Sequence, residues 1–166
     1  MMNPYLTITH KMLSGRILLY PILLGLPLLF SCSKQPVTGE DERVTTMGNL
    51  EVTARLVEIS GELPNIPLYD YAFVMKYQVL QVHRGEVKED TIYVGQYNPL
   101  KPRNQVADVR SGEIGGNVKK FQAGDVHRMA LDVPIDDYYM GGIVNRYFEQ
   151  KVGPIYWAVW TNQVIE

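Results

Sequence analysis

Residues 69–82, with the sequence YDYAFVMKYQVLQV, carry the longest β-strand pattern in the chain. Apolar side chains recur there at every second position, in a series that includes Phe73 and Tyr77. Alternation with period two is typical of a strand that buries one face, and aromatic and β-branched residues favour strands. The opposite face becomes apolar only at Leu80 and Val82. This change of face predicts a bend or bulge partway along the strand, as in strands that wrap round small barrels.

Further segments have the alternation or the β-branched and aromatic content of strands. They are residues 50–59, 91–94, 126–133 and 155–165. The connections at 98–124 and 134–154 are long and contain many Gly and Pro residues, with a short helix expected around residues 143–150. Strands without a long helix predict an all-β fold. We expect a small five-stranded OB-like barrel, or a small β-sandwich, with long loops and at most one or two short helices.

The overall composition is that of one globular domain. The 166 residues are 46% hydrophobic and 20% charged, and 16 Lys and Arg against 18 Asp and Glu give a formal net charge of −2. The apolar content and the small net charge exclude a disordered chain. The mildly acidic balance gives no electrostatic basis for binding nucleic acid, so no nucleic-acid partner is expected. One cysteine excludes an internal disulfide framework and a cysteine-based zinc cluster.

The N-terminal region has the layout of a secretory signal. The segment ILLYPILLGLPLLF, residues 17–30, is uncharged, Lys11 and Arg16 precede it, and no acidic residue occurs before Glu40. At roughly 1.5 Å per residue, a helix over this segment would cover about 21 Å, less than the ~30 Å of a hydrocarbon core. The signal is therefore preferred to the alternative of an uncleaved anchor helix.

The apolar run ends in LFSC, residues 29–32, which resembles the lipobox of bacterial lipoproteins. The resemblance implies that residues 1–31 are a signal peptide that is cleaved off. It also implies that Cys32 receives a diacylglyceryl thioether and that its new amino group is acylated. Such acyl chains together anchor a protein stably, so a membrane, reached through this lipid, is the first expected partner.

The lipobox resemblance also suggests a domain division and an address. Residues 32–48 are polar and without periodicity, which predicts a lipidated cysteine followed by a flexible tether, and residues 49–166 form the β domain. Ser33 is not the Asp that marks inner-membrane retention in many Gram-negative lipoproteins. The resemblance therefore implies the bacterial cell envelope, at the outer membrane and facing the periplasm.

The segments LEVTARLVEI, residues 50–59, and YAFVMKYQVLQVHRGEVKEDTIYV, residues 71–94, resemble bacterial secreted domains of the netrin-like type. These domains are relatives of the tissue inhibitors of metalloproteinases and are barrels of the oligonucleotide/oligosaccharide-binding type. The resemblance is one of strand pattern, and the disulfide cysteines usual in that family are missing here. It supports the barrel fold and not inhibition of proteases.

One pair of residues could carry metal or acid–base chemistry. Asp125 and His127 are separated by one residue, so they lie on the same face of the predicted strand. They could supply two metal ligands or an acid–base pair, whereas the alternative is a strand-entry Asp followed by a half-buried His. A metal-binding or hydrolytic envelope protein that uses this pair is therefore the alternative function.

No other arrangement in the sequence assembles an enzyme. Asp132, Asp136 and Asp137 gather around Pro134, but they lack the spacing of a Ca²⁺ loop and are expected in a solvated loop. The sequence contains no His-Glu-x-x-His, no Gly-x-Ser-x-Gly and no P-loop. We therefore expect no catalytic residue and no cofactor, and favour a non-enzymatic protein.

Aromatic residues gather near the C-terminus. Trp157 and Trp160 lie in one predicted strand, where strict alternation would point them to opposite faces; an alternative is that these aromatics fill the core. An exposed aromatic beside Arg and Asn suits sugar or peptide binding. The expected binding residues are Arg103, Arg110, Tyr138, Tyr139, Arg146 and Trp160.

These observations predict a lipid-anchored binding or assembly module of the cell envelope. It could be an accessory to the export or modification of envelope polysaccharide. The expected partners are an envelope polysaccharide or another envelope protein, and the arginines favour an acidic ligand.

Overall fold

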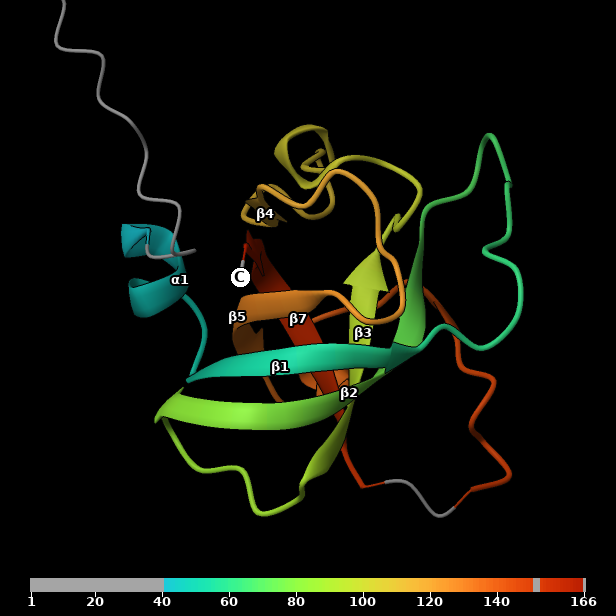
Figure 1. Cartoon of the computed structure of the whole chain (residues 1–166). Helices are drawn as coiled ribbons and strands as arrows, with labels where there is room; N and C mark the ends of the chain where they lie inside the picture. Colours follow the sequence, from blue (N-terminus) through green and yellow to red (C-terminus); the bar gives the residue numbers. More distant parts are fainter. Residues whose placement is uncertain (1–40, 151–152, 166) are drawn as a thin grey trace, which may run out of the picture. The chain divides into compact units, whose positions relative to one another are not determined.

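The computed structural model describes residues 41–150 and 153–165 (Figure 1). Residues 1–31, expected to be a signal peptide, and Cys32 lie outside the described residues, so lipidation and cleavage remain predictions. Within the described residues, no helix is long and apolar enough to span a membrane.

The core of the fold is a closed ring of strands. They are β1 (Leu50–Glu58), β2 (Tyr71–Arg84), β3 (Thr91–Tyr97), β5 (Val126–Asp132) and β7 (Ile155–Val164). The strands neighbour one another in the order β1–β5–β7–β3–β2, and pairing of β1 with β2 closes the ring. β3 and β7 are parallel, whereas the other pairs of the ring are antiparallel. The expected all-β fold, a small five-stranded OB-like barrel, is therefore confirmed.

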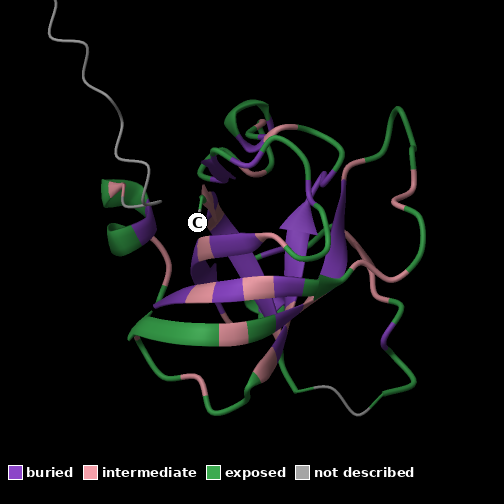
Figure 2. Cartoon of the chain, viewed as in Figure 1, coloured by how far each residue is buried: buried purple, intermediate pink, exposed green. Residues whose placement is uncertain are grey.

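Strand β2 bends, as its sequence predicts. Residues 72–78 pair with β3, whereas residues 76–84 pair with β1. Leu80 and His83 have no partner in β1, because the register shifts at each of them. Such bulges bend a strand and increase its twist, which lets β2 turn from one neighbour to the other and close the ring. Figure 2 shows this half of β2 as mostly exposed, and Leu80 is 47% exposed.

The interior of the barrel is filled by alternate residues of its strands. Phe73 and Tyr77 are fully buried there, whereas Lys76, on the other face of β2, is half-buried. The strands contribute Leu50, Val52, Ala54, Leu56, Tyr71, Phe73, Met75, Tyr77, Ile92, Val94, Met129, Leu131, Tyr156 and Ala158. The predicted inward register is therefore confirmed from Tyr71 to Tyr77, whereas Tyr69 precedes β2 and is 56% exposed.

A second apolar layer covers part of the outer side of the barrel wall. Its buried members are Ala72, Tyr97, Val106, Ile114, Ile135, Tyr139, Trp157 and Val159. Some of these belong to β2, β3 and β7, and the others come from the two long connections. The connections are therefore packed against the strands, and they carry the walls of the site described below.

Short elements stiffen these connections. They are η1 (Arg103–Gln105), β4 (Gly115–Gly116), η2 (Ile135–Asp137) and β6 (Gly142–Val144). The helix expected around residues 143–150 does not form. Residues 142–144 pair in parallel with residues 71–73 instead, because the open edge of β2 offers them backbone partners.

One helix, α1 (Glu42–Thr46), precedes the barrel in the segment expected to be a tether. Asp41 caps it: its Oδ1 accepts hydrogen bonds from the backbone N–H groups of Arg43 and Val44, at 2.8 and 3.2 Å. Val44 is fully buried. The folded part of the chain therefore includes residues before 49, the boundary expected from the sequence.

Candidate binding groove over β5 and β7

Both tryptophans of β7 lie on the outer face of the barrel. Trp157 pairs with Asp132 and Trp160 pairs with Ala130, two positions apart on β5 and therefore on one face. Between them the register shifts, so that β7 gains one residue, Val159. The expectation that the two tryptophans point to opposite faces is therefore wrong. The bulge re-aims Trp160, as bulges commonly do to a side chain.

Two adjoining cavities extend over this outer face, and together we call them the groove. The Tyr138 cavity has a volume of about 320 Å³ and includes Tyr138, Trp157 and Asp132 in its lining. The Trp160 cavity has a volume of about 450 Å³ and includes Trp160 and Arg43. The residues that line both cavities are Met47, Gly112, Glu113 and Ile114.

The apolar part of the Tyr138 cavity is held rigidly. The ring of Tyr139 stacks on Trp157 with centroids 4.8 Å apart and an interplanar angle of 15°. Tyr97 meets Trp157 edge-on, at 6.2 Å. Trp157 is only 5% exposed, so its indole is fixed by packing before any ligand arrives. Tyr139, an expected contact, therefore supports the cavity from behind.

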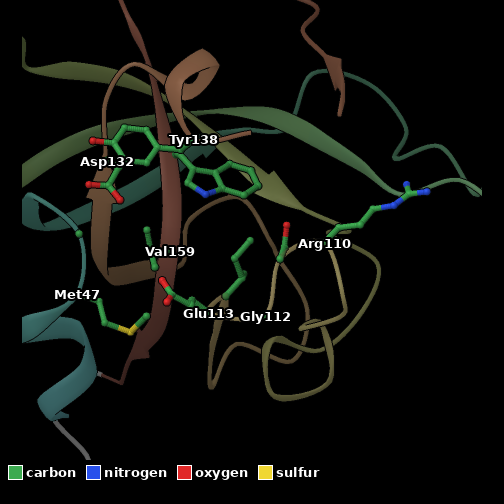
Figure 3. Close-up of a pocket in the computed structure, with 11 residues that line it drawn as sticks. Met47, Arg110, Gly112, Glu113, Asp132, Tyr138 and Val159 are labelled. Carbon is green, nitrogen blue, oxygen red and sulfur yellow. The ribbon is translucent and has the colours of Figure 1, made fainter. Parts of the chain in front are cut away.

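Asn49 connects the polar groups at one end of this cavity. Its Nδ2 donates to the hydroxyl of Tyr138 at 3.0 Å, and its backbone N–H donates to Asp132 Oδ1 at 2.9 Å. Asp132 is only 9% exposed. Figure 3 shows Tyr138 and Asp132 side by side, with Glu113 and Met47 also around the cavity. Tyr138, expected as a binding residue, does line it, and its ring is 45% exposed.

Arg110 lies at the rim. Its Nη1 is 3.9 Å from Asp70 Oδ2, and Figure 3 shows its side chain extending away from the other labelled residues. The positive charge is therefore directed out of the cavity.

The Trp160 cavity is organised by Asp41. Trp160 Nε1 donates to Asp41 Oδ2 at 3.0 Å, and Asn162 Nδ2 donates to the same oxygen. Burial acts to raise the pKa of the Asp41 carboxyl, but these bonds and those from the α1 amides outweigh it and hold the pKa below its usual range. Arg43 lies over the Trp160 ring at 4.7 Å. The carboxylate therefore joins α1 to β7.

Gly115 allows the loop after Gly112 to approach Trp160 closely. A Cβ at position 115 would come within 2.3 Å of the indole. Together with Arg43, this contact covers much of the Trp160 ring. Trp160 therefore builds the wall of its cavity more than it offers a free stacking face.

Arg103 is not at the surface. It is only 1% exposed, and its Nη2 donates to backbone carbonyls of Tyr97, Asn98 and Lys101 at 2.5, 2.9 and 3.2 Å. Burial lowers the pKa of this guanidinium to about 10. Arg103, expected as a ligand contact, instead holds the start of the long connection in place. It does so because the short loop after β3 places these three carbonyls around its guanidinium.

Arg146 lies apart from the groove. Its Nη1 donates to the backbone oxygen of Ser60 at 2.7 Å, and its guanidinium lies 5.6 Å from the ring of Phe73. The structure thus brings Arg110, Tyr138 and Trp160 to the groove, and Arg103 lines the Trp160 cavity as an almost fully buried residue. The side chain of Arg146 lies elsewhere, and Tyr139 is not placed as a ligand contact.

His127 is enclosed in the barrel. It is fully buried, its Nδ1 lies 3.2 Å from the hydroxyl of Tyr77, and Phe121 packs edge-on against its ring. Burial, and then the charge of Arg103, lower the pKa of His127 to about 4. Among the described residues, no group of three or more His, Cys, Asp or Glu side chains could hold a metal ion. His127 would reach an external substrate only if the barrel opened.

The sequence analysis missed two acidic residues of the groove. Asp132 was expected in a solvated loop, but it is the last residue of β5 and nine-tenths buried. Its position one residue beyond the inward-facing Leu131 was the available signal, since alternation places it outward. Glu113 had no local signal, because the connection around it is irregular.

Comparisons with protein-family models, with curated proteins and with solved structures find no match for this chain.

Proposed function

We propose that this protein is a lipid-anchored module of the bacterial cell envelope that binds a glycan in the groove over β5 and β7. The observation that supports this most is the Tyr138 cavity. It combines a rigid indole, a half-exposed phenol and polar groups in one hollow of about 320 Å³.

This combination suits a sugar. A pyranose ring has apolar faces edged by hydroxyl groups, so it needs a flat apolar surface beside hydrogen-bonding groups. The half-exposed ring of Tyr138, beside the mostly buried Trp157 and Val159, provides the first. The Asp132 and Glu113 carboxylates and the Ser111 hydroxyl provide the second. The volume lies within the range of roughly 300–1,000 Å³ that is common for small-ligand sites.

The expected anchor agrees with such a role. The peptide from Cys32 to Asp41 can span at most roughly 30 Å, because extended chain covers 3.3–3.6 Å per residue. Asp41 hydrogen-bonds Trp160, so a lipid on Cys32 would hold the groove close to a membrane surface. Binding there would serve the export or modification of an envelope polysaccharide.

The anchor is tested with Cys32→Ala. No other thiol in the chain can accept the lipid. A fatty-acid probe fed to cells should label the wild type and not the variant, which should accumulate as the precursor. Labelling that persists in Cys32→Ala would disprove lipidation at this residue.

Glycan binding is tested with the full chain in detergent on an array of bacterial envelope glycans. Tyr138→Ala should reduce binding to the recognised glycan by about tenfold or more, which corresponds to about 1.4 kcal/mol. Tyr69→Ala is the matched control, because Tyr69 is 56% exposed and lines a different cavity. Equal binding by the wild type and Tyr138→Ala, or stronger loss in Tyr69→Ala, would move the site out of the groove.

A further inference from the structure

The charge of the Tyr138 cavity differs from what the arginines of the sequence suggest. Arg103 is buried beneath the long connection, Arg146 lies elsewhere, and Arg110 points toward Asp70. The charged residues that line the cavity are Asp132, Glu113 and Arg110, and of these only Arg110 extends its side chain away from the other labelled residues (Figure 3). The cavity is therefore acidic, although the sequence analysis favoured an acidic ligand.

Asp132 has an oxygen available. Its Oδ1 accepts from the Asn49 N–H, which it shares with the backbone oxygen of Leu131. The described residues give its Oδ2 neither a hydrogen bond nor an ion pair, although the side chain is nine-tenths buried. A carboxylate oxygen that has no donor from the protein favours a ligand that brings a donor or a cation. Its position at the cavity places that unused oxygen where a ligand can reach it.

Glu113 adds a second negative charge. It is exposed, and no ion pair within the described part of the chain neutralises it. Tyr138, 45% exposed, contributes an accessible aromatic ring, whose electron-rich π system attracts cations. Carboxylates and aromatic rings around one hollow are thus complementary to an ammonium group.

We propose that the Tyr138 cavity selects an amino sugar with a free, protonated amine, held by Asp132 and Glu113 against Tyr138 and Trp157. This inference rests on the proposed glycan-binding function and names the class of sugar. A lysine side chain of a partner protein carries the same charge but has no ring to cover the apolar surface of Trp157 and Val159. The cavity volume of about 320 Å³, which is in the range of small-ligand sites, also favours the sugar.

The experiment is calorimetric titration of the full chain in detergent at pH 6. The probes are a β-1,4-linked glucosamine trisaccharide with free amines and its fully N-acetylated counterpart, which differ in charge at nitrogen. We expect the free-amine probe to bind about tenfold more tightly, a difference of about 1.4 kcal/mol. Added salt should weaken its binding, because screening acts on the ion pairs.

Variants identify the carboxylates. Asp132→Asn keeps an oxygen for the Asn49 N–H and removes the charge, so it should abolish most of the preference for the free amine. Glu113→Gln, at an exposed position, should reduce the preference for the free amine and leave the fold unchanged. Glu86→Gln is the control, because Glu86 is 79% exposed and lines neither cavity of the groove, so the preference should stay unchanged.

The possible outcomes distinguish failure of the amino-sugar inference from failure of the proposed glycan binding. Equal affinity for both trisaccharides, lost in Tyr138→Ala, would overturn the ammonium inference and leave glycan binding in place. Failure of both probes, with Asp132-dependent binding of trilysine, would replace the sugar by a basic segment of a partner protein. If none of the three probes binds, the inference is overturned. If both Asp132→Asn and Glu113→Gln keep the preference for the free amine, these carboxylates are not its cause and the inference is likewise overturned.

Discussion

The interior of the barrel and the groove on its outer face are built from alternating residues of the same strands, yet they differ in almost every property. Inside, Met129 and Leu131 of β5 are fully buried among apolar neighbours. Outside, Asp132 of the same strand lies in a polar hollow with a half-exposed Tyr138. The inner face of the strands forms one apolar core, whereas their outer face is partly covered by a second apolar layer and partly open at the groove. The lining of the groove depends on groups contributed by distant segments.

The largest expected effect is in the interior. Phe73→Ala removes a fully buried ring and should lower the free energy of unfolding by about 3–5 kcal/mol. Lys76→Ala, on the other face of β2, should change it by no more than about 0.5 kcal/mol. Denaturant melts of both variants measure the difference, and equal losses would contradict the inward register of β2.

The next effect comes from the polar group inside the barrel. The pKa of His127 is about 4 in the folded state and about 6.5 when unfolded, so the unfolded chain binds more protons between these values. The stabilising contribution is present above pH 6.5 and is lost as the pH falls. Between pH 7 and pH 5 the free energy of unfolding should decrease by about 2 kcal/mol.

His127→Asn provides the comparison for this pH effect, because an amide does not titrate in this range. Melts of both proteins at pH 7 and pH 5 should show a smaller decrease for the variant. An identical pH dependence would mean that His127 is accessible to protons in the folded protein, and that the interior is less closed than described.

A smaller effect is expected where the groove is tied to the fold. Asp41→Ala removes the cap of α1 and the acceptor for Trp160 Nε1, and should cost about 1–2 kcal/mol. Glu42→Ala, an exposed change in the same helix, should cost a few tenths of a kcal/mol, on the order of a surface substitution. If both variants are equally stable, α1 contributes nothing to the Trp160 cavity.

The smallest effect on stability belongs to the groove itself. Glu113→Gln should change the free energy of unfolding by less than about 0.5 kcal/mol, since the side chain is exposed and contributes no described ion pair. A clear gain in stability would indicate repulsion between Glu113 and Asp132. A clear loss would indicate that Glu113 supports the loop, and the division between stability and binding would then be less sharp.

The sequence predicted the interior well because a strand's two faces differ in periodicity, and periodicity is local. Phe73 and Tyr77 were placed correctly, and the change of face near Leu80 correctly indicated a bulge in β2. The same rule failed at Trp160, because the bulge at Val159 arises from pairing with β5 and leaves no pattern within β7 itself. Arg103 was misplaced for a related reason. Arg103 donates to backbone carbonyls, and a pattern of side chains in the sequence does not predict such partners.

By itself, the sequence determined the class of the fold, the strands and most of their buried faces, because hydrophobic alternation is a local property of each strand segment. It also supports the prediction of a lipid-anchored envelope protein, since the signal and the lipobox are contiguous motifs. Only the tertiary structure decided which groups share the groove. Met47, Glu113, Asp132 and Tyr138 lie in four separate segments, and they meet because barrel closure and packing of the long connections bring those segments together. The sign of the charge in the Tyr138 cavity was decided at the same level, because burial and pairing removed the arginines from it.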